Sequence, residues 1–134
     1  MLYAIQGGAV ANYPDGQRPI LHLVSSAEAA AAALPCVYTD GHAEIVFSSF
    51  HKDLEKLGEV VDFKLMGSDW WNDTPEHPDR KRKRQAEFLA HQFFPWTLVE
   101  SIGVIDQQMK QAVDKILEGA LHRPEVSVRR RWYY

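Results

Sequence analysis

Residues 84–90 read Arg84-Gln85-Ala86-Glu87-Phe88-Leu89-Ala90, and two conformations compete for them. Helix propensity favours a helix, in which Glu87 is an acidic residue near the N-terminus that the helix dipole stabilises. In an extended chain, Gln85 and Glu87 lie on one face and Phe88 lies on the other. The extended alternative gives a carboxylate and an amide that converge on one small ligand, and the residues alone leave both alternatives open.

Two runs of basic residues concentrate the positive charge of the chain. They hold eight of the 15 Lys and Arg residues, although the net charge of the whole chain is −3. A cluster of positive charge can bind phosphate groups at one place on the surface even when the net charge of the protein is negative. A solvated charged face is the alternative that charge alone leaves open. The runs are Arg80-Lys81-Arg82-Lys83-Arg84 and Arg129-Arg130-Arg131.

Two adjacent tryptophans, Trp70 and Trp71, stand upstream of the first basic run. Residues 72–79 contain two prolines and no hydrophobic periodicity, which indicates a loop, and long loops inside compact domains are usually functional. Neighbouring side chains of an extended segment point to opposite faces, so at least one indole ring is expected to be exposed. We therefore predict that this segment binds unpaired bases and phosphates. Burial of the tryptophans in the core is the alternative.

The rest of the chain mixes helix and strand patterns. No internal repeat or linker interrupts it, which indicates one α+β domain over residues 1–134. The expected helices are the opening residues as far as Gly7-Gly8, residues 29–33 behind a capping box of Ser25 and Glu28, residues 50–57, and a helix that Asp106 caps and that ends at Leu121. The expected strands are residues 19–24, 36–39, 45–47, 98–104, 126–128 and 132–134.

The residues give no support to a metal site or a membrane span. The six histidines show no His-x-x-x-His spacing, and Cys36 is the only cysteine, so neither a Cys/His site nor a disulfide within the chain is expected. No apolar run approaches the roughly 20 residues that a membrane span needs, and the opening residues lack the features of a signal peptide. We expect a cytoplasmic protein without a metal and away from membranes.

Several segments together resemble the DarT family of toxins, which ADP-ribosylate thymidine bases in single-stranded DNA with NAD as the donor. The similarity runs over essentially the whole chain, including residues 126–134, and is most specific at residues 84–89. The segments are Met1-Leu2-Tyr3-Ala4-Ile5, Pro19-Ile20-Leu21-His22-Leu23-Val24, Thr39-Asp40-Gly41-His42-Ala43, Trp71-Asn72-Asp73-Thr74, residues 79–91 and Phe93-Phe94-Pro95-Trp96.

The resemblance implies an ADP-ribosyltransferase-like α+β fold and roles for individual residues. Gln85-Ala86-Glu87 matches the Gln-x-Glu signature of the superfamily, which makes Glu87 the expected catalytic glutamate. Gln85 and His42 are expected beside the NAD. The implied partners are single-stranded DNA and a macrodomain antitoxin similar to DarG. The segment between His42 and Glu87 matches the substrate-recognising loop, with the expected DNA-binding residues Trp70, Trp71, Arg80, Lys81, Arg82 and Arg84.

One departure from the family pattern concerns the NAD-binding half of the domain. In the family, this half begins upstream with a strand histidine and a later arginine that holds the NAD phosphates. Met1 matches a position well inside the family's domain, so an N-terminal truncation is expected. A catalytically inactive fragment or relative, acting as a single-stranded DNA-binding or antitoxin-binding module, is the second function that the sequence leaves open.

Overall fold

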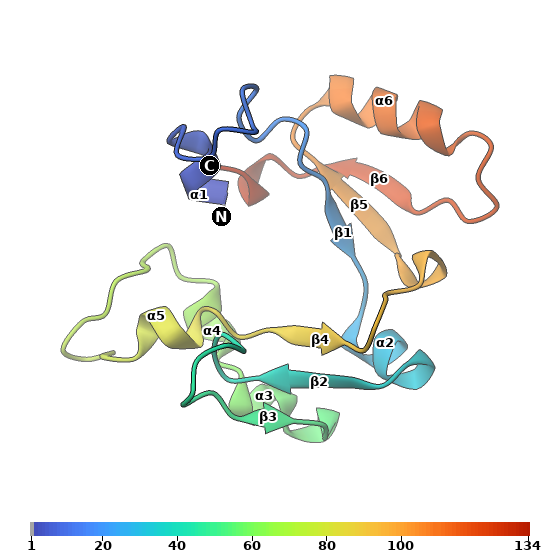
Figure 1. Ribbon diagram of the computed structural model, residues 1–134. Helices are drawn as coiled ribbons and strands as arrows, with labels where there is room; N and C mark the ends of the chain where they lie inside the picture. The colour runs from blue at the N-terminus through green and yellow to red at the C-terminus, as the bar shows by residue number, and fades with distance from the viewer. Residues whose placement is uncertain (1) are drawn as a thin grey trace. The chain divides into compact units, whose positions relative to one another are not determined.

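The computed structural model describes residues 2–134, which form two compact units (Figure 1). The first unit contains the chain up to Ser26 together with Pro95–Tyr134, and the second contains Ala27–Phe94. Both units combine helices with short strands, as the α+β class predicts. Within residues 2–134, no helix is long and apolar enough to cross a membrane. Over the same residues, no group of three or more candidate ligand side chains is placed to hold a metal ion.

The first unit is built on a three-stranded sheet in the order β1-β5-β6. β1 (His22–Val24) is antiparallel to β5 (Ser101–Val104), which is parallel to β6 (Glu125–Val128). The short η2 (Trp96–Leu98) precedes β5, and the amphipathic α6 (Gln107–Leu117) connects β5 to β6. The predicted cap is confirmed, since Asp106 Oδ1 accepts the Met109 N–H at 2.7 Å. The core contains Val99, Ile102, Val104, Val113 and Val126.

The two ends of the first unit are tied together by the buried side chain of Gln17. Its amide donates to the Leu2 carbonyl of α1 (Leu2–Gln6) at 2.9 Å and accepts the Tyr134 N–H at 2.9 Å. The predicted strand at residues 132–134 is wrong, because η3 (Arg130–Trp132) stands at the beginning of this segment. Trp132 packs against Gly103, where a Cβ would collide with the indole ring. This side-chain contact outweighs the strand propensity of the aromatic residues.

The second unit is built on a sheet in the order β3-β2-β4 (Figure 1). β2 (Cys36–Thr39) is the central strand and follows α2 (Ala27–Ala33). It is antiparallel to both β3 (Phe50–His51) and β4 (Phe88–Ala90). The segment between β3 and β4 contains η1 (Leu54–Lys56), α3 (Leu57–Val60), α4 (Phe63–Met66) and α5 (Arg80–Lys83).

Three local predictions between residues 25 and 57 need correction. Residues 45–47 form a turn in place of a strand, and Val46 and Phe47 project into solvent with 92% and 85% exposure. The helix predicted over residues 50–57 is wrong at its start, where residues 50–51 pair with β2 as β3, and helical structure begins at Leu54. The capping box is absent, since the Ser25 hydroxyl has no hydrogen-bond partner among residues 2–134 and α2 begins at Ala27.

Candidate active site

Glu87 lies in an extended segment between α5 and β4. Helix α5 ends at Lys83, and Gln85 belongs to the turn that follows, with its N–H donating to the Arg82 carbonyl at 3.0 Å. The backbone of Glu87 continues the pairing of β4 with β2, since its carbonyl accepts the Thr39 N–H at 2.9 Å. The chain is therefore extended from Glu87 onward, and the helix predicted by propensity is wrong. Gln85 lies in the turn, so the predicted extended geometry that places it on one face with Glu87 does not apply to it.

The Glu87 carboxylate is held by a backbone N–H from another part of the chain. Its Oε2 accepts the Ala43 N–H at 2.6 Å, across 44 residues of sequence. A charge-assisted hydrogen bond of this kind fixes the carboxylate more firmly than a neutral one. The Oε1 atom accepts no hydrogen bond within residues 2–134, and the side chain is half-buried. One carboxylate oxygen is thus anchored while the other is available to a ligand hydroxyl.

His42 stands next to Ala43 in the same loop. Its Nδ1 accepts the Glu44 N–H at 3.2 Å, so the proton of the neutral imidazole is assigned to Nε2. Its carbonyl accepts the Ser48 hydroxyl at 2.7 Å, and Asp40 Oδ1 accepts the Ser49 N–H at 2.8 Å, which closes the loop. Because of this local bonding, His42 is oriented close to the anchor of the Glu87 carboxylate.

Arg82 forms ion pairs with two aspartates, Asp79 before α5 and Asp40 after β2. It donates to both carboxylate oxygens of Asp79, at 2.8 and 2.7 Å, and its Nη1 lies 3.0 Å from Asp40 Oδ2. Burial alone raises the pKa of Asp40, but hydrogen bonds from the Ser49 N–H and the guanidinium outweigh it and lower the net pKa. The same guanidinium lowers the pKa of Asp79. Arg82 therefore connects α5 to the end of β2.

The two tryptophans differ in their surroundings. Arg84 lies over the Trp71 ring at 4.2 Å and also donates to the Leu65 and Trp70 carbonyls at 3.3 and 3.2 Å. This cation–π contact holds the Trp71 ring in place. The side chain of Trp71 is 41% exposed, whereas that of Trp70 is 72% exposed. Arg80 donates to the Ser68 hydroxyl at 3.2 Å. The Trp70 ring is therefore open to solvent, whereas the Trp71 ring is covered by the Arg84 guanidinium.

Two lysines of the basic run differ from its arginines. Lys81 and Lys83 are exposed, and neither forms an ion pair within the part of the chain that the structure describes. The three arginines of the run all donate to protein groups. The lysines are consequently the side chains of this run with the most freedom to meet phosphate.

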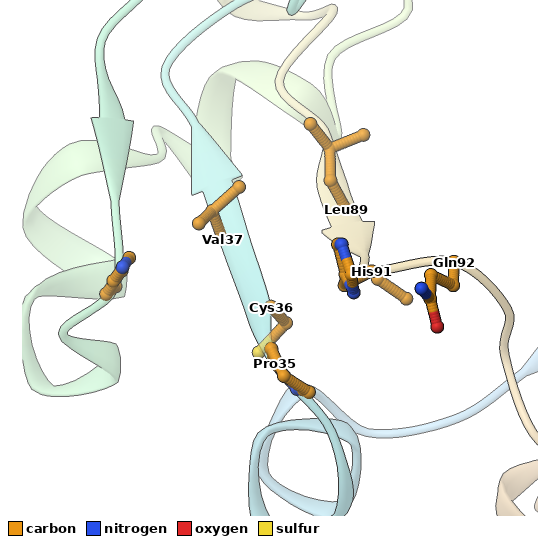
Figure 2. A pocket seen from close by; sticks show the side chains of 8 residues that line it. Pro35, Cys36, Val37, Leu89, His91 and Gln92 are labelled. Atoms are coloured by element: carbon orange, nitrogen blue, oxygen red, sulfur yellow. The ribbon is translucent and has the colours of Figure 1, made fainter.

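A separate pocket of about 490 Å³ lies at the other end of β4 (Figure 2). Cys36, Val37 and Leu89 contribute apolar surface, and His91 and Gln92 lie on the β4 side. Since Glu87 precedes β4 and these two residues follow it, the pocket does not belong to the arrangement around Glu87.

Thr39, Asp40 and Ala43 contact the predicted site residues, but sequence reasoning assigned them no role. Their contacts join residues more than 40 positions apart, so no local pattern could reveal them. The available signal was the segment Thr39-Asp40-Gly41-His42-Ala43, which carries part of the family resemblance.

Comparison with known proteins places this geometry in a family. Residues 1–134 match the family model described as DarT, ssDNA thymidine ADP-ribosyltransferase. The chain is 44% identical over 137 residues to a DNA ADP-ribosyl transferase of Thermus sp. (strain 2.9) and 46% identical to one of Thermus aquaticus. It is covered completely in both comparisons, and it spans 63% and 58% of the length of these relatives.

Solved structures agree with this assignment. The Thermus sp. 2.9 DarT in complex with ADP-ribosylated ssDNA superposes with a TM-score of 0.88 at 43% identity, over 99% of this chain and 63% of that chain. The same protein in complex with NAD⁺ also gives a TM-score of 0.88, over 66% of its length. The predicted ADP-ribosyltransferase-like α+β fold is thereby confirmed. Family model, relatives and structures agree, and the chain belongs to the DarT family of ssDNA thymidine ADP-ribosyltransferases.

Proposed function

We propose that this protein transfers ADP-ribose from NAD to thymidine bases in single-stranded DNA, as the toxin of a toxin–antitoxin pair. The observation that carries the proposal is the Glu87 carboxylate, with Oε2 anchored by the Ala43 N–H and Oε1 available. The support from relatives is that a 43% identical DarT has been solved with NAD⁺ and with ADP-ribosylated ssDNA. In this proposal residues 1–134 belong to a single transferase domain, because the family match is continuous through both units.

The proposed chemistry is a substitution at C1′ of the nicotinamide ribose. Nicotinamide leaves with the electrons of the glycosidic bond, a thymine ring nitrogen forms the new bond to C1′, and the nitrogen's proton is released. Glu87 Oε1 would bind the ribose 2′-hydroxyl, and its negative charge would stabilise the oxocarbenium-like transition state. Gln85 and His42 would contact the NAD beside this carboxylate.

On the DNA side, the proposal assigns base stacking to Trp70 and Trp71 and phosphate binding to the basic run. Arg80, Arg82 and Arg84 would combine their protein contacts with contacts to DNA. The proposed partners are single-stranded DNA and a macrodomain antitoxin, and the proposed location is the cytoplasm.

The direct test is transfer of labelled ADP-ribose from NAD to two oligonucleotides of equal length. One contains thymidine, and in the other every thymidine is replaced by cytidine. We expect label only on the thymidine oligonucleotide, and only when it is single-stranded. Binding of the oligonucleotide without any transfer would reject the enzyme and favour the second function, a DNA-binding or antitoxin-binding module.

The two exposed lysines give a further prediction for DNA binding. Replacing Lys81 and Lys83 together by Gln should weaken binding of oligothymidine and reduce the slope of log affinity against log salt concentration by about 1.4, since each phosphate contact on a single strand contributes about 0.7. Lys115→Gln is the control, because Lys115 is an exposed lysine on α6. Fluorescence anisotropy at several salt concentrations measures the slope. An unchanged slope in the double variant would mean that these lysines belong to a solvated face.

A further inference from the structure

The hydroxyl of Thr39 connects the backbone of Glu87 to the loop that holds the Glu87 carboxylate. Thr39 ends the central strand β2, pairs with Phe50 of β3, and has 0% of its surface exposed. Its Oγ1 accepts the Glu87 N–H at 3.0 Å and lies 2.5 Å from the Gly41 carbonyl. The Glu87 carbonyl is more distant from Oγ1, at 3.4 Å, so the hydroxyl proton is directed to Gly41.

These three hydrogen bonds form a closed ring together with the backbone of residues 41–43 and the side chain of Glu87. The ring runs from the Glu87 N–H to the Thr39 hydroxyl, on to the Gly41 carbonyl, along the loop to the Ala43 N–H, and back to Glu87 Oε2. The position of the carboxylate relative to its own backbone is therefore set by the same hydroxyl that fixes the start of the loop. We name the ring formed by Thr39, Gly41, Ala43 and Glu87 the carboxylate frame.

Arg82 lies against the carboxylate frame at Gly41. A Cβ on Gly41 would lie only 2.8 Å from Arg82 Nη1 and 3.0 Å from Ser48 Oγ, so the glycine allows the loop to approach the guanidinium. Arg82 Nη1 also donates to the Asp40 carbonyl at 3.3 Å. Arg82 thus lies directly against Gly41 and limits movement of the loop in that direction.

We propose that Thr39 is a positioning residue of this protein, whose hydroxyl holds the carboxylate frame and thereby places Glu87 for reaction. This inference rests on the proposed function only for its kinetic consequence, because the frame itself is a property of the chain. Valine at position 39 would form the strand equally well, because it has the same branched shape and a high strand propensity. Valine lacks only the hydroxyl, and without it the Glu87 carboxylate is expected to be displaced. A displaced reacting group can reduce the rate of a reaction about 100-fold.

The frame can be tested in the unmodified chain by NMR. The Thr39 hydroxyl proton should be observable in slow exchange with water, because it is buried and directed to Gly41. The amide proton of Ala43 should move when the Glu87 carboxylate is titrated, because the two are bonded. A Thr39 hydroxyl in rapid exchange, or an Ala43 amide that does not follow the carboxylate, would overturn the proposal.

The matched variants are Thr39→Val, which removes the hydroxyl, and Thr39→Ser, which keeps it. We expect Thr39→Val to abolish the dependence of the Ala43 amide on Glu87 ionisation and to lower kcat about 10- to 100-fold with less than a threefold change in KM for NAD. Thr39→Ser should restore both. Ser25→Ala is the control, since the buried Ser25 hydroxyl has no hydrogen-bond partner among residues 2–134. It should change neither readout.

The outcomes separate this proposal from the proposed function. Retention of the Ala43 response and of kcat in Thr39→Val overturns the positioning role. An Ala43 response that is present in the wild-type chain and lost in Thr39→Val, when the wild-type chain transfers no ADP-ribose, supports the frame and rejects the proposed function. Should Thr39→Val not fold, the NMR measurements on the unmodified chain and on Thr39→Ser decide the proposal.

Discussion

Replacement of Glu87 by glutamine is expected to lower ADP-ribose transfer by at least about 10²- to 10³-fold, the effect of removing one preorganised electrostatic group from a transition state. The amide has nearly the shape of the carboxylate, and its oxygen can still accept the Ala43 N–H, so the fold of the loop is retained. The negative charge is lost, and with it the stabilisation of positive charge that develops on the ribose. Initial rates at saturating NAD and oligonucleotide measure the effect.

The matched control is Glu44→Gln in the same loop. Glu44 is exposed, and it is its backbone N–H that donates to His42. This variant should transfer ADP-ribose at the wild-type rate. If Glu87→Gln kept more than a tenth of the wild-type rate while its circular dichroism and melting temperature were unchanged, Glu87 would not be the catalytic glutamate.

The course of the chain around Glu87 illustrates what sequence reasoning could reach. Helix propensity differs by only a few tenths of a kcal/mol between ordinary residues, so it is a weak guide for a stretch as short as residues 84–90. The extended conformation is fixed by pairing of Phe88 and Leu89 with Tyr38 and Val37, which are about 50 residues away in sequence. The family resemblance favoured the correct alternative because it reflects these distant contacts. By contrast, β2 is a local apolar run, and its bounds at residues 36–39 are confirmed.

The basic run shows what the sequence could not predict. Five consecutive basic residues suggest equivalent phosphate ligands, but the structure gives them different environments. Arg82 is neutralised by Asp40, and Arg84 lies over Trp71, while Lys81 and Lys83 are exposed. The identity of a charge's partner is a tertiary property, so charge clustering alone does not distinguish a phosphate ligand from a side chain that holds the fold together.

Arg82 provides the second large expected effect, because it holds α5 against the end of β2. Arg82→Gln should lower the free energy of unfolding by about 1.5–3 kcal/mol, the range for a hydrogen bond to a charged group, since Arg82 and Asp40 are mostly buried with side-chain exposures of 21% and 24%. Transfer should also fall, because Gly41 loses the support of the guanidinium. Lys83→Gln, an exposed change at the end of the same helix, is the control for stability.

The loss of unfolding free energy in Arg82→Gln should depend on pH. This dependence distinguishes an Arg82 that stabilises the fold from one that only binds DNA. The folded-state pKa values of Asp40 and Asp79 are lowered, so their contribution to stability is present above the ordinary carboxyl pKa of about 4 and is lost as the pH falls through the lowered values. Denaturant unfolding of wild type and Arg82→Gln should therefore differ most near neutral pH and converge below about pH 4. If Arg82 served only to bind phosphate, the two unfolding curves would coincide at every pH, and the variant would change only the salt dependence of DNA binding.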